Sequence, residues 1–243
     1  MWKTLTKICI LLGVTGYLIY AVVAFNKTDE SKVCTGLDII VNDKDSTGFV
    51  NENEVRELLV NNKLFPEGKA QKDIDLVKME QVLKASPYID EALCYKASDG
   101  RMTIQVTPRI PVLHVLNQAG EDFYIDNRGG IMPRGHHHIN LIVMTGHVNK
   151  KTAGPLYSSL GVALNKDTFW NRQIQEIYVT QGGELELTPS VGNHIIQLGD
   201  TSHLSDKLSR MKTFYAEGLG KAGWNRYKTI NLKFSNQVIC TRR

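Results

Sequence analysis

The sequence predicts an α+β protein in which a single N-terminal transmembrane helix precedes a β-α-α-β-β domain and a mixed, β-rich domain that ends in a hairpin. Three features predict this architecture: an uncharged run over residues 8–25, strand and helix periodicities in that order over 34–108, and alternating apolar residues over 230–234. We expect a cytoplasmic tail over 1–7, a transmembrane helix over 8–25, a linker over 26–36, and domains over 37–110 and 111–243.

The uncharged run is ICILLGVTGYLIYAVVAF. As a helix it extends about 27 Å, close to the hydrocarbon thickness of a bilayer. Lys3 and Lys7 precede it and acidic residues follow it, so we expect the tail in the cytoplasm and residues 26–243 on the far side of the membrane. A cleaved signal peptide is the alternative, because residues 22–24 have the small side chains of a cleavage site. The length of the run favours a retained anchor.

The composition, with 42% hydrophobic and 22% charged residues, is that of an ordinary globular protein. The formal net charge is +4 and no cluster of lysine or arginine marks a basic stripe, so we expect no nucleic acid partner. Cys9 lies in the apolar run, and Cys34, Cys94 and Cys240 define no disulfide framework. Either two of the last three form a pair or all three are small buried residues, the interpretation we favour.

The first domain carries clear helix boundaries. Asn51 and Glu54 have the spacing of a capping box at a helix start. Pro87 ends the second helix, because proline has no amide to continue it. The expected elements are a strand over 37–41, a helix that begins at Asn51 and ends at Asn61 and Asn62, and a second helix over 76–85. Strands over 89–96 and 102–106, joined by a turn at 98–101, complete the domain.

The second domain has weaker local signals. We expect a hairpin about residues 127–130, a strand over 139–146, a helix over 155–164, strands over 173–180, 185–188 and 194–198, and a long helix that Thr201 or Ser202 caps and Gly218 and Gly220 end. The final hairpin is expected to pair Ile230–Phe234 with Gln237–Thr241 about a turn at Ser235 and Asn236.

Residues 85–115, ASPYIDEALCYKASDGRMTIQVTPRIPVLHV, resemble the end of the POTRA domain in the FtsQ/DivIB cell-division family. Residues 123–133 are similar to the hairpin that opens the family's β domain, and residues 139–146 stand where the family has "l-P-v-l-x-G". INLKFSNQVICTR resembles the family's terminal hairpin "i-D-L-R-y-x-x-G-x-a-v", with Asn231 in place of Asp and Gln237 in place of Gly. The exit from the first domain also lacks the family's acidic residue.

The resemblance implies a scaffold in the inner membrane at the division septum, with its bulk in the periplasm. Its partners would be FtsB-like and FtsL-like membrane proteins, with no cofactor and no small-molecule substrate. A closing strand with a free edge can capture a partner strand through backbone hydrogen bonds. By resemblance the binding residues are Phe234, Asn236, Gln237, Val238 and Ile239, with Trp224 and Tyr227 as aromatic support. The alternative for Phe234 and Val238 is that both are core residues of the hairpin.

No motif for catalysis is present, whether GxSxG, HExxH or a phosphate-binding loop, so we do not expect an enzyme. A metal ion could bind to three consecutive histidines, His136, His137 and His138. Neighbouring residues of an extended segment point to opposite sides, however, so we expect a solvated loop instead of a metal site. Asp122 and Asp126 could be imagined as paired catalytic carboxylates. Because they flank a strand in a hairpin, we expect them to be turn and capping residues instead. The rival functions are a POTRA-containing accessory of envelope transport or outer-membrane assembly, and an anchored periplasmic enzyme with a polar cavity.

Overall fold

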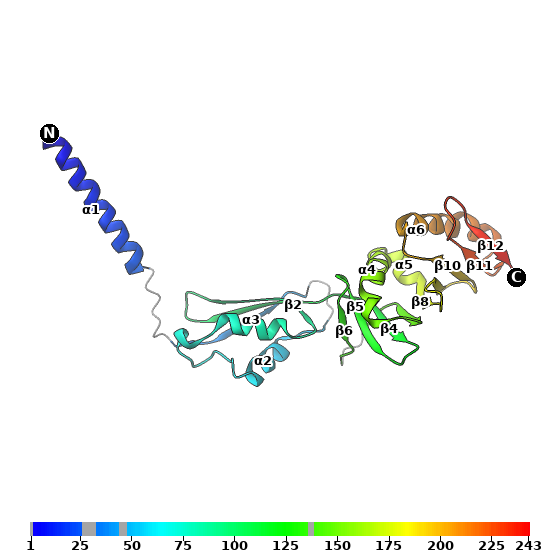
Figure 1. The fold of residues 1–243 in the computed structure, drawn as a ribbon, viewed down its shortest axis with the longest axis horizontal. Coiled ribbons are helices and arrows are strands. Elements are labelled where there is room, and N and C mark those ends of the chain that lie inside the picture. Colours follow the sequence, from blue (N-terminus) through cyan, green and yellow to red (C-terminus); the bar gives the residue numbers. More distant parts are fainter. Residues whose placement is uncertain (1, 26–32, 44–47, 136–138) are drawn as a thin grey trace. The chain divides into compact units, whose positions relative to one another are not determined.

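A computed structural model describes residues 2–25, 33–43, 48–135 and 139–243 (Figure 1). Helix α1 (Trp2–Phe25, 24 residues) contains the run that we expect to span a membrane. In the described part of the chain, no helix meets both the length and the apolar character that a bilayer crossing requires. The structure therefore does not confirm the predicted anchor. The chain forms two compact units.

The first unit has the predicted order of strand, two helices and two strands. Its elements are β1 (Leu37–Val41), α2 (Glu52–Asn61), a short 3-10 turn (Gln71–Asp73), α3 (Leu76–Lys84), β2 (Ile89–Lys96) and β3 (Met102–Pro108). The sheet order is β1-β3-β2. Leu59, Met79 and Ile104 are fully buried, whereas Leu93 and Tyr95 are exposed, so the helices cover one face of the sheet and leave the other open.

The second unit is built on one nine-stranded sheet of order β12-β11-β10-β9-β8-β7-β4-β5-β6. Its strands are β4 (Pro111–Asn117), β5 (Asp122–Asp126), β6 (Ile131–Pro133), β7 (Val143–Gly146), β8 (Ile174–Val179), β9 (Leu185–Pro189), β10 (Ile195–Gly199), β11 (Tyr227–Asn231) and β12 (Ile239–Arg242). Strands β4 and β7, β7 and β8, and β10 and β11 pair in parallel, and the other pairs are antiparallel.

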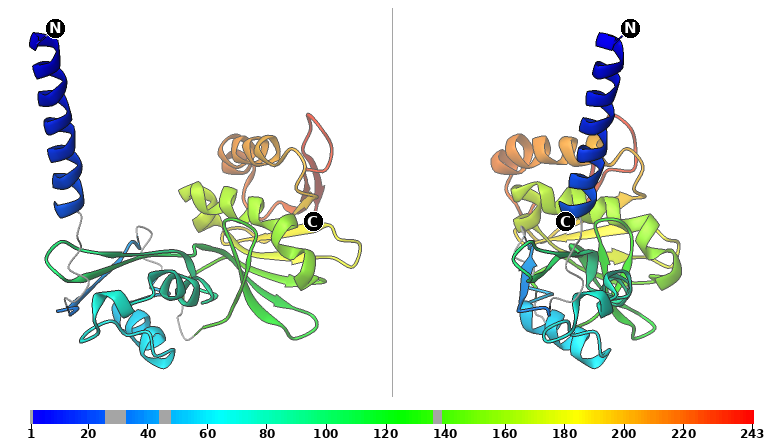
Figure 2. Two further views of the ribbon diagram at one scale, coloured as in Figure 1. Left: turned by 60° about the vertical axis from the view of Figure 1, so that its left-hand side comes forward. Right: turned by 90° about the vertical axis from the view of Figure 1, so that its left-hand side faces the viewer.

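Parallel neighbours need a crossover, and helices supply the two longest ones. Helices α4 (Lys150–Lys166) and α5 (Thr168–Gln173) connect β7 to β8. Helix α6 (Leu204–Thr213), a π-helical segment η2 (Phe214–Leu219) and α7 (Gly220–Ala222) connect β10 to β11. The helices gather on one side of the sheet (Figure 2), and buried side chains from both layers, among them Trp170, Leu160, Met144 and Ile230, form one core.

Three helix boundaries in the second unit differ from the prediction. Helix α4 begins at Lys150 rather than at residue 155, because the side chain of Asn149 caps it by accepting from the amide of Lys151. Neither Thr201 nor Ser202 caps α6, since the capping position belongs to His203 in a left-handed conformation. The helical path also continues past Gly218 and Gly220 and ends before Gly223, where φ is 93°.

The terminal hairpin is shorter than predicted. The predicted turn at Ser235 and Asn236 is present, but β11 ends at Asn231 and β12 begins only at Ile239, so the turn lies within a longer loop over residues 232–238. The amide of Leu232 donates to the carbonyl of Gln197. Three carbonyls of the loop accept from Arg210 on α6, a long-range contact that the local sequence pattern does not reveal.

Candidate functional site

Strand β12 lies at one end of the nine-stranded sheet and pairs with β11 on one side. Thr241 stands opposite Thr229, Ile239 stands opposite Asn231, and the amide of Arg243 donates to the carbonyl of Arg226 at 3.3 Å. Because backbone groups of alternate residues point to opposite sides of a strand, Ile239, Thr241 and Arg243 direct theirs toward β11. The amides and carbonyls of the intervening Cys240 and Arg242 therefore point away from the sheet.

This outer edge is open in the described part of the chain, where no side chain bonds the backbone of Cys240 or Arg242. The edge of the first unit at β2 differs, because the amide of Cys94 donates to Oε1 of Glu80 on α3 at 2.8 Å. At the opposite end of the large sheet, β6 has three residues and ends with Pro133. Such features protect an edge against pairing. Strand β12, with four residues, contains no proline, and in the described part of the chain no side chain bonds its outward backbone.

The structure places the predicted binding residues in two environments. Ile239 lies on β12 with 42% of its surface exposed, and Phe234 lies in the loop with 48% exposed. Asn236, which has a φ of 59°, and Gln237 are exposed in the same loop. Val238 is half-buried against the core. Phe234 is therefore not a core residue. Val238, in contrast, packs against the core, as the alternative interpretation expects.

Cys240 and Arg242 were not among the predicted binding residues: the predicted closing strand, Gln237–Thr241, includes Cys240 but ends before Arg242, whereas β12 runs from Ile239 to Arg242. The backbone groups that face outward on β12 belong to these two residues. Alternation of apolar residues could not have located the end of β11, since Leu232 and Phe234 in the loop continue its pattern.

Trp224 and Tyr227 are half-buried beneath the hairpin and pack against the core. The ring of Trp224 lies 5.2 Å from that of Tyr215, and the ring of Tyr227 lies 5.9 Å from that of Phe214, both on η2. These aromatic contacts hold the start of β11 against the helical crossover.

A buried histidine–tyrosine pair lies in this aromatic layer. Nε2 of His194 is 2.8 Å from the hydroxyl of Tyr215, and both residues are buried. Desolvation by burial lowers the pKa of His194 and raises the pKa of Tyr215. Desolvation is the largest influence on the pKa of His194, and a backbone hydrogen bond with Trp224 opposes it. A neutral imidazole is therefore the form that the folded protein accommodates.

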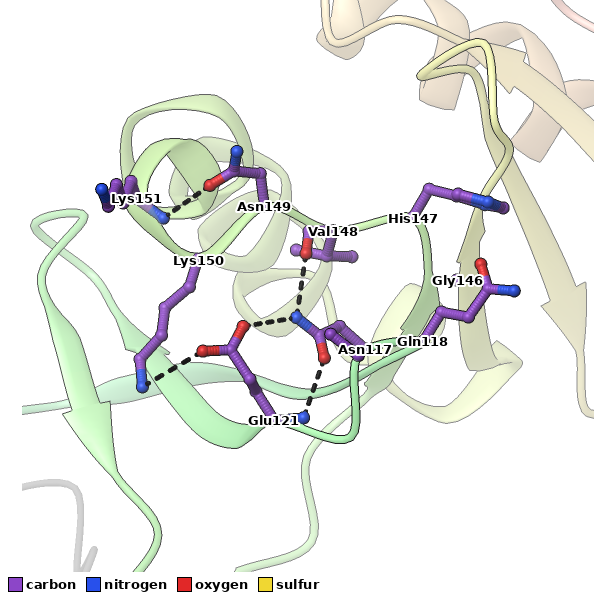
Figure 3. Close-up of a pocket in the computed structure, with 10 residues that line it drawn as sticks. Asn117, Gln118, Glu121, Gly146, His147, Val148, Asn149, Lys150 and Lys151 are labelled. Atoms are coloured by element: carbon purple, nitrogen blue, oxygen red, sulfur yellow. Dashed lines mark hydrogen bonds and ion pairs between the residues drawn. The ribbon is translucent and has the colours of Figure 1, made fainter.

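Figure 3 shows a cavity of about 630 Å³ at the start of α4, which opens widely to solvent. The Nδ2 group of Asn117 donates to Oε2 of Glu121 at 2.7 Å and to the carbonyl of Val148 at 3.0 Å, and Lys150 lies 3.8 Å from Glu121. These polar groups satisfy one another, so they do not converge on a common point where a substrate would react.

The other candidates for chemistry have structural roles or lie outside the described residues. Asp122 contacts His114 and Arg134, and Asp126 accepts from Arg109 and from the amides of its own turn. No group of three metal-binding side chains occurs within the described ranges, and residues 136–138 are not among them. Cys34 and Cys94 are buried, Cys240 is half-buried, and all three are free thiols.

Comparisons with known families agree with this architecture. A model described as a POTRA-like domain matches residues 32–107, and one described as FtsQ/DivIB, C-terminal related, matches residues 110–241. No curated protein matches the chain. The fold thus defines a POTRA-containing protein whose second, β-rich domain ends in an edge strand.

The chain belongs to the FtsQ/DivIB family. Proteins of this family are non-enzymatic scaffolds of bacterial cell division, so a role among the division proteins follows in general terms.

Proposed function

We propose that this protein is a non-enzymatic divisome scaffold that recruits FtsB-like and FtsL-like membrane proteins by adding a partner strand to β12. The open outer edge of β12 is the observation that carries the proposal. An unpaired row of amides and carbonyls is a template for another chain, and the backbone bonds supply affinity without any catalytic group.

Selectivity would come from side chains beside the edge. Ile239 and Phe234 are large apolar residues that present nearly half of their surface to solvent. A guest strand that places apolar side chains over them would bury this surface at about 25 cal/mol per Å². Asn236 and Gln237 offer polar groups in the loop next to the strand.

The test removes one outward amide and leaves the pairing with β11 intact. Proline is tolerated on an edge strand where its missing amide faces outward, and residue 242 meets this condition. Arg242→Pro should weaken co-purification of the FtsB-like protein at least about tenfold, because one net hydrogen bond is lost and the ring obstructs the guest strand. Arg242→Ala, which keeps the amide, is the matched control and should retain capture.

The full-length protein is purified from membranes of its source cells, and its partners are identified and quantified by mass. Equal amounts of the FtsB-like protein on wild type and Arg242→Pro would refute strand addition at β12. Recovery of an outer-membrane or transport component in its place would favour the rival accessory function.

We also propose that α1 anchors the protein in the inner membrane. The support is the uncharged run over residues 8–25 and the exposure of apolar side chains along it, such as Leu11, Leu18 and Val22. The protein should remain in the membrane pellet after a wash with alkaline carbonate, which releases peripheral proteins. Its appearance in the wash would contradict anchoring.

A further inference from the structure

The loop over residues 232–238 has few hydrogen bonds of its own. The amide of Lys233 donates to Oδ1 of Asn231 at 2.9 Å, and Asn236 adopts a left-handed conformation with a φ of 59°. Five consecutive residues, 233–237, are exposed. A segment of this kind keeps one conformation only if something outside it holds its backbone.

Arg210 on α6 holds the loop at three points. Its Nη1 donates to the carbonyl of Phe234 at 2.9 Å and to that of Gln237 at 2.7 Å, and its Nη2 lies 3.4 Å from the carbonyl of Leu232. Its Nε donates to Oδ2 of Asp206 at 3.0 Å, and the side chain is only 17% exposed. The planar guanidinium therefore spans the loop from its first residue to the residue before Val238.

We propose that Arg210 is a positioning residue for partner capture. It fixes residues 232–238 so that β12 enters the sheet in one register, with the backbone of Cys240 and Arg242 directed outward and Phe234 exposed beside them. The inference rests on the proposed strand addition, and its physical basis is preorganisation: an edge already ordered before binding does not lose that entropy on binding. No partner atom needs to touch Arg210.

Only an arginine fits this role. Its five N–H donors lie in one fixed plane, which lets it serve several carbonyls and a carboxylate at once. Lysine at this position would keep the charge but concentrate its donors at a single nitrogen. Arg210→Lys should therefore behave more like Arg210→Gln than like wild type, which distinguishes positioning from a simple charge effect.

The first readout is amide hydrogen exchange of the full-length protein without a partner. Arg210→Gln should raise exchange over residues 232–243 by about tenfold or more, because hydrogen bonds from a charged donor are lost, and should leave β8 and β9 unchanged. Lys212→Gln is the matched control. It makes the same charge change on the same helix, but its ion pair joins Asp167. Unchanged exchange over 232–243 in Arg210→Gln would overturn the proposal.

The second readout is affinity for the purified periplasmic segment of the FtsB-like protein from the same cells. If the competent fraction of the edge falls to a tenth, the apparent Kd rises about tenfold. We expect this rise for Arg210→Gln and none for Lys212→Gln. Faster exchange with an unaltered Kd would refute a role in capture. If the wild-type protein does not bind this segment, the proposed function fails, while the exchange experiment still decides whether Arg210 orders the edge.

Asp206→Asn provides a variant that keeps the arginine. It removes the charged acceptor that orients the guanidinium and leaves all three loop carbonyls in place. Exchange over 232–243 should rise by less than in Arg210→Gln. If Arg210→Gln does not fold, the proposal is decided on Asp206→Asn, in which wild-type exchange and affinity would refute it.

Discussion

Gly154 on α4 meets the backbone of the turn between β5 and β6, and a single methyl group at this position should destabilise the second unit. A Cβ on residue 154 would lie 1.9 Å from the carbonyl oxygen of Gly129 and 2.8 Å from its carbonyl carbon, whereas ordinary contact begins at 3.4 Å. Both atoms belong to the backbone and cannot rotate away, so Gly154→Ala must move the helix away from the turn.

The magnitude follows from two opposing effects. Overpacking of a core contact costs about 1–3 kcal/mol, and a clash with rigid backbone takes the upper end of that range. Alanine in place of glycine in a helix interior stabilises by about 0.5–1 kcal/mol. The net expectation is a loss of about 2 kcal/mol in the free energy of unfolding.

Gly220 provides the matched control. It is also helical, with φ −58°, and the nearest atom to its hypothetical Cβ is the carbonyl oxygen of Tyr215 at 3.9 Å, an ordinary contact. Gly220→Ala should therefore stabilise the protein by about 0.5–1 kcal/mol. The same substitution in two helical segments of one domain is expected to act in opposite directions.

The assay is urea unfolding of the full-length protein followed by tryptophan fluorescence, to which Trp170, 2% exposed, contributes from within the core. At an m-value of about 2 kcal/mol per molar urea, a loss of 2 kcal/mol lowers the midpoint by about 1 M. A midpoint for Gly154→Ala at or above that of wild type would refute the close approach of helix and turn.

Two further predictions concern buried polar groups. Burial lowers the pKa of His194 in the folded state, so the unfolded chain binds the proton more readily. The stability that the neutral imidazole contributes is therefore complete above about pH 6.5 and declines as the pH falls toward the lowered pKa. The free energy of unfolding falls by at most about 1.4 kcal/mol per pH unit. Urea midpoints of wild type should therefore fall more between pH 7 and pH 5 than those of His194→Gln, and equal falls would contradict the assignment. Asp126 is 3% exposed and accepts a hydrogen bond from Arg109. Asp126→Asn should lower the free energy of unfolding by about 3 kcal/mol, because it leaves the guanidinium without its carboxylate. A shift in the urea midpoint equivalent to less than about 1 kcal/mol would show that the fold does not need the pair.

The first unit could be predicted almost residue by residue, because its signals are local. Asn51 precedes α2 directly, β2 occupies the predicted residues 89–96, and α3 ends before Pro87. Each boundary depends on neighbours a few positions away in sequence, such as a cap, a proline or a glycine turn.

The second unit could be predicted only in part. Its strand order joins segments that are distant in sequence, and no local pattern carries that information. The sequence also misled at the terminal hairpin, since an arginine on α6 draws residues 232–238 into a loop that period-2 alternation does not reveal. Helix α5 was missed although Asp167, which caps it by accepting from the amide of Phe169, was a usable signal.

The geometry of β12 has a mechanical consequence. A guest aligned with its four residues would run for about 13 Å beside the sheet, at roughly 3.3 Å per residue. Tension along the guest would load all of its backbone bonds together in shear, whereas a sideways pull would peel them apart one after another. A tether of this kind withstands force in one direction and yields in another, which suits an attachment that must bear strain and still be released.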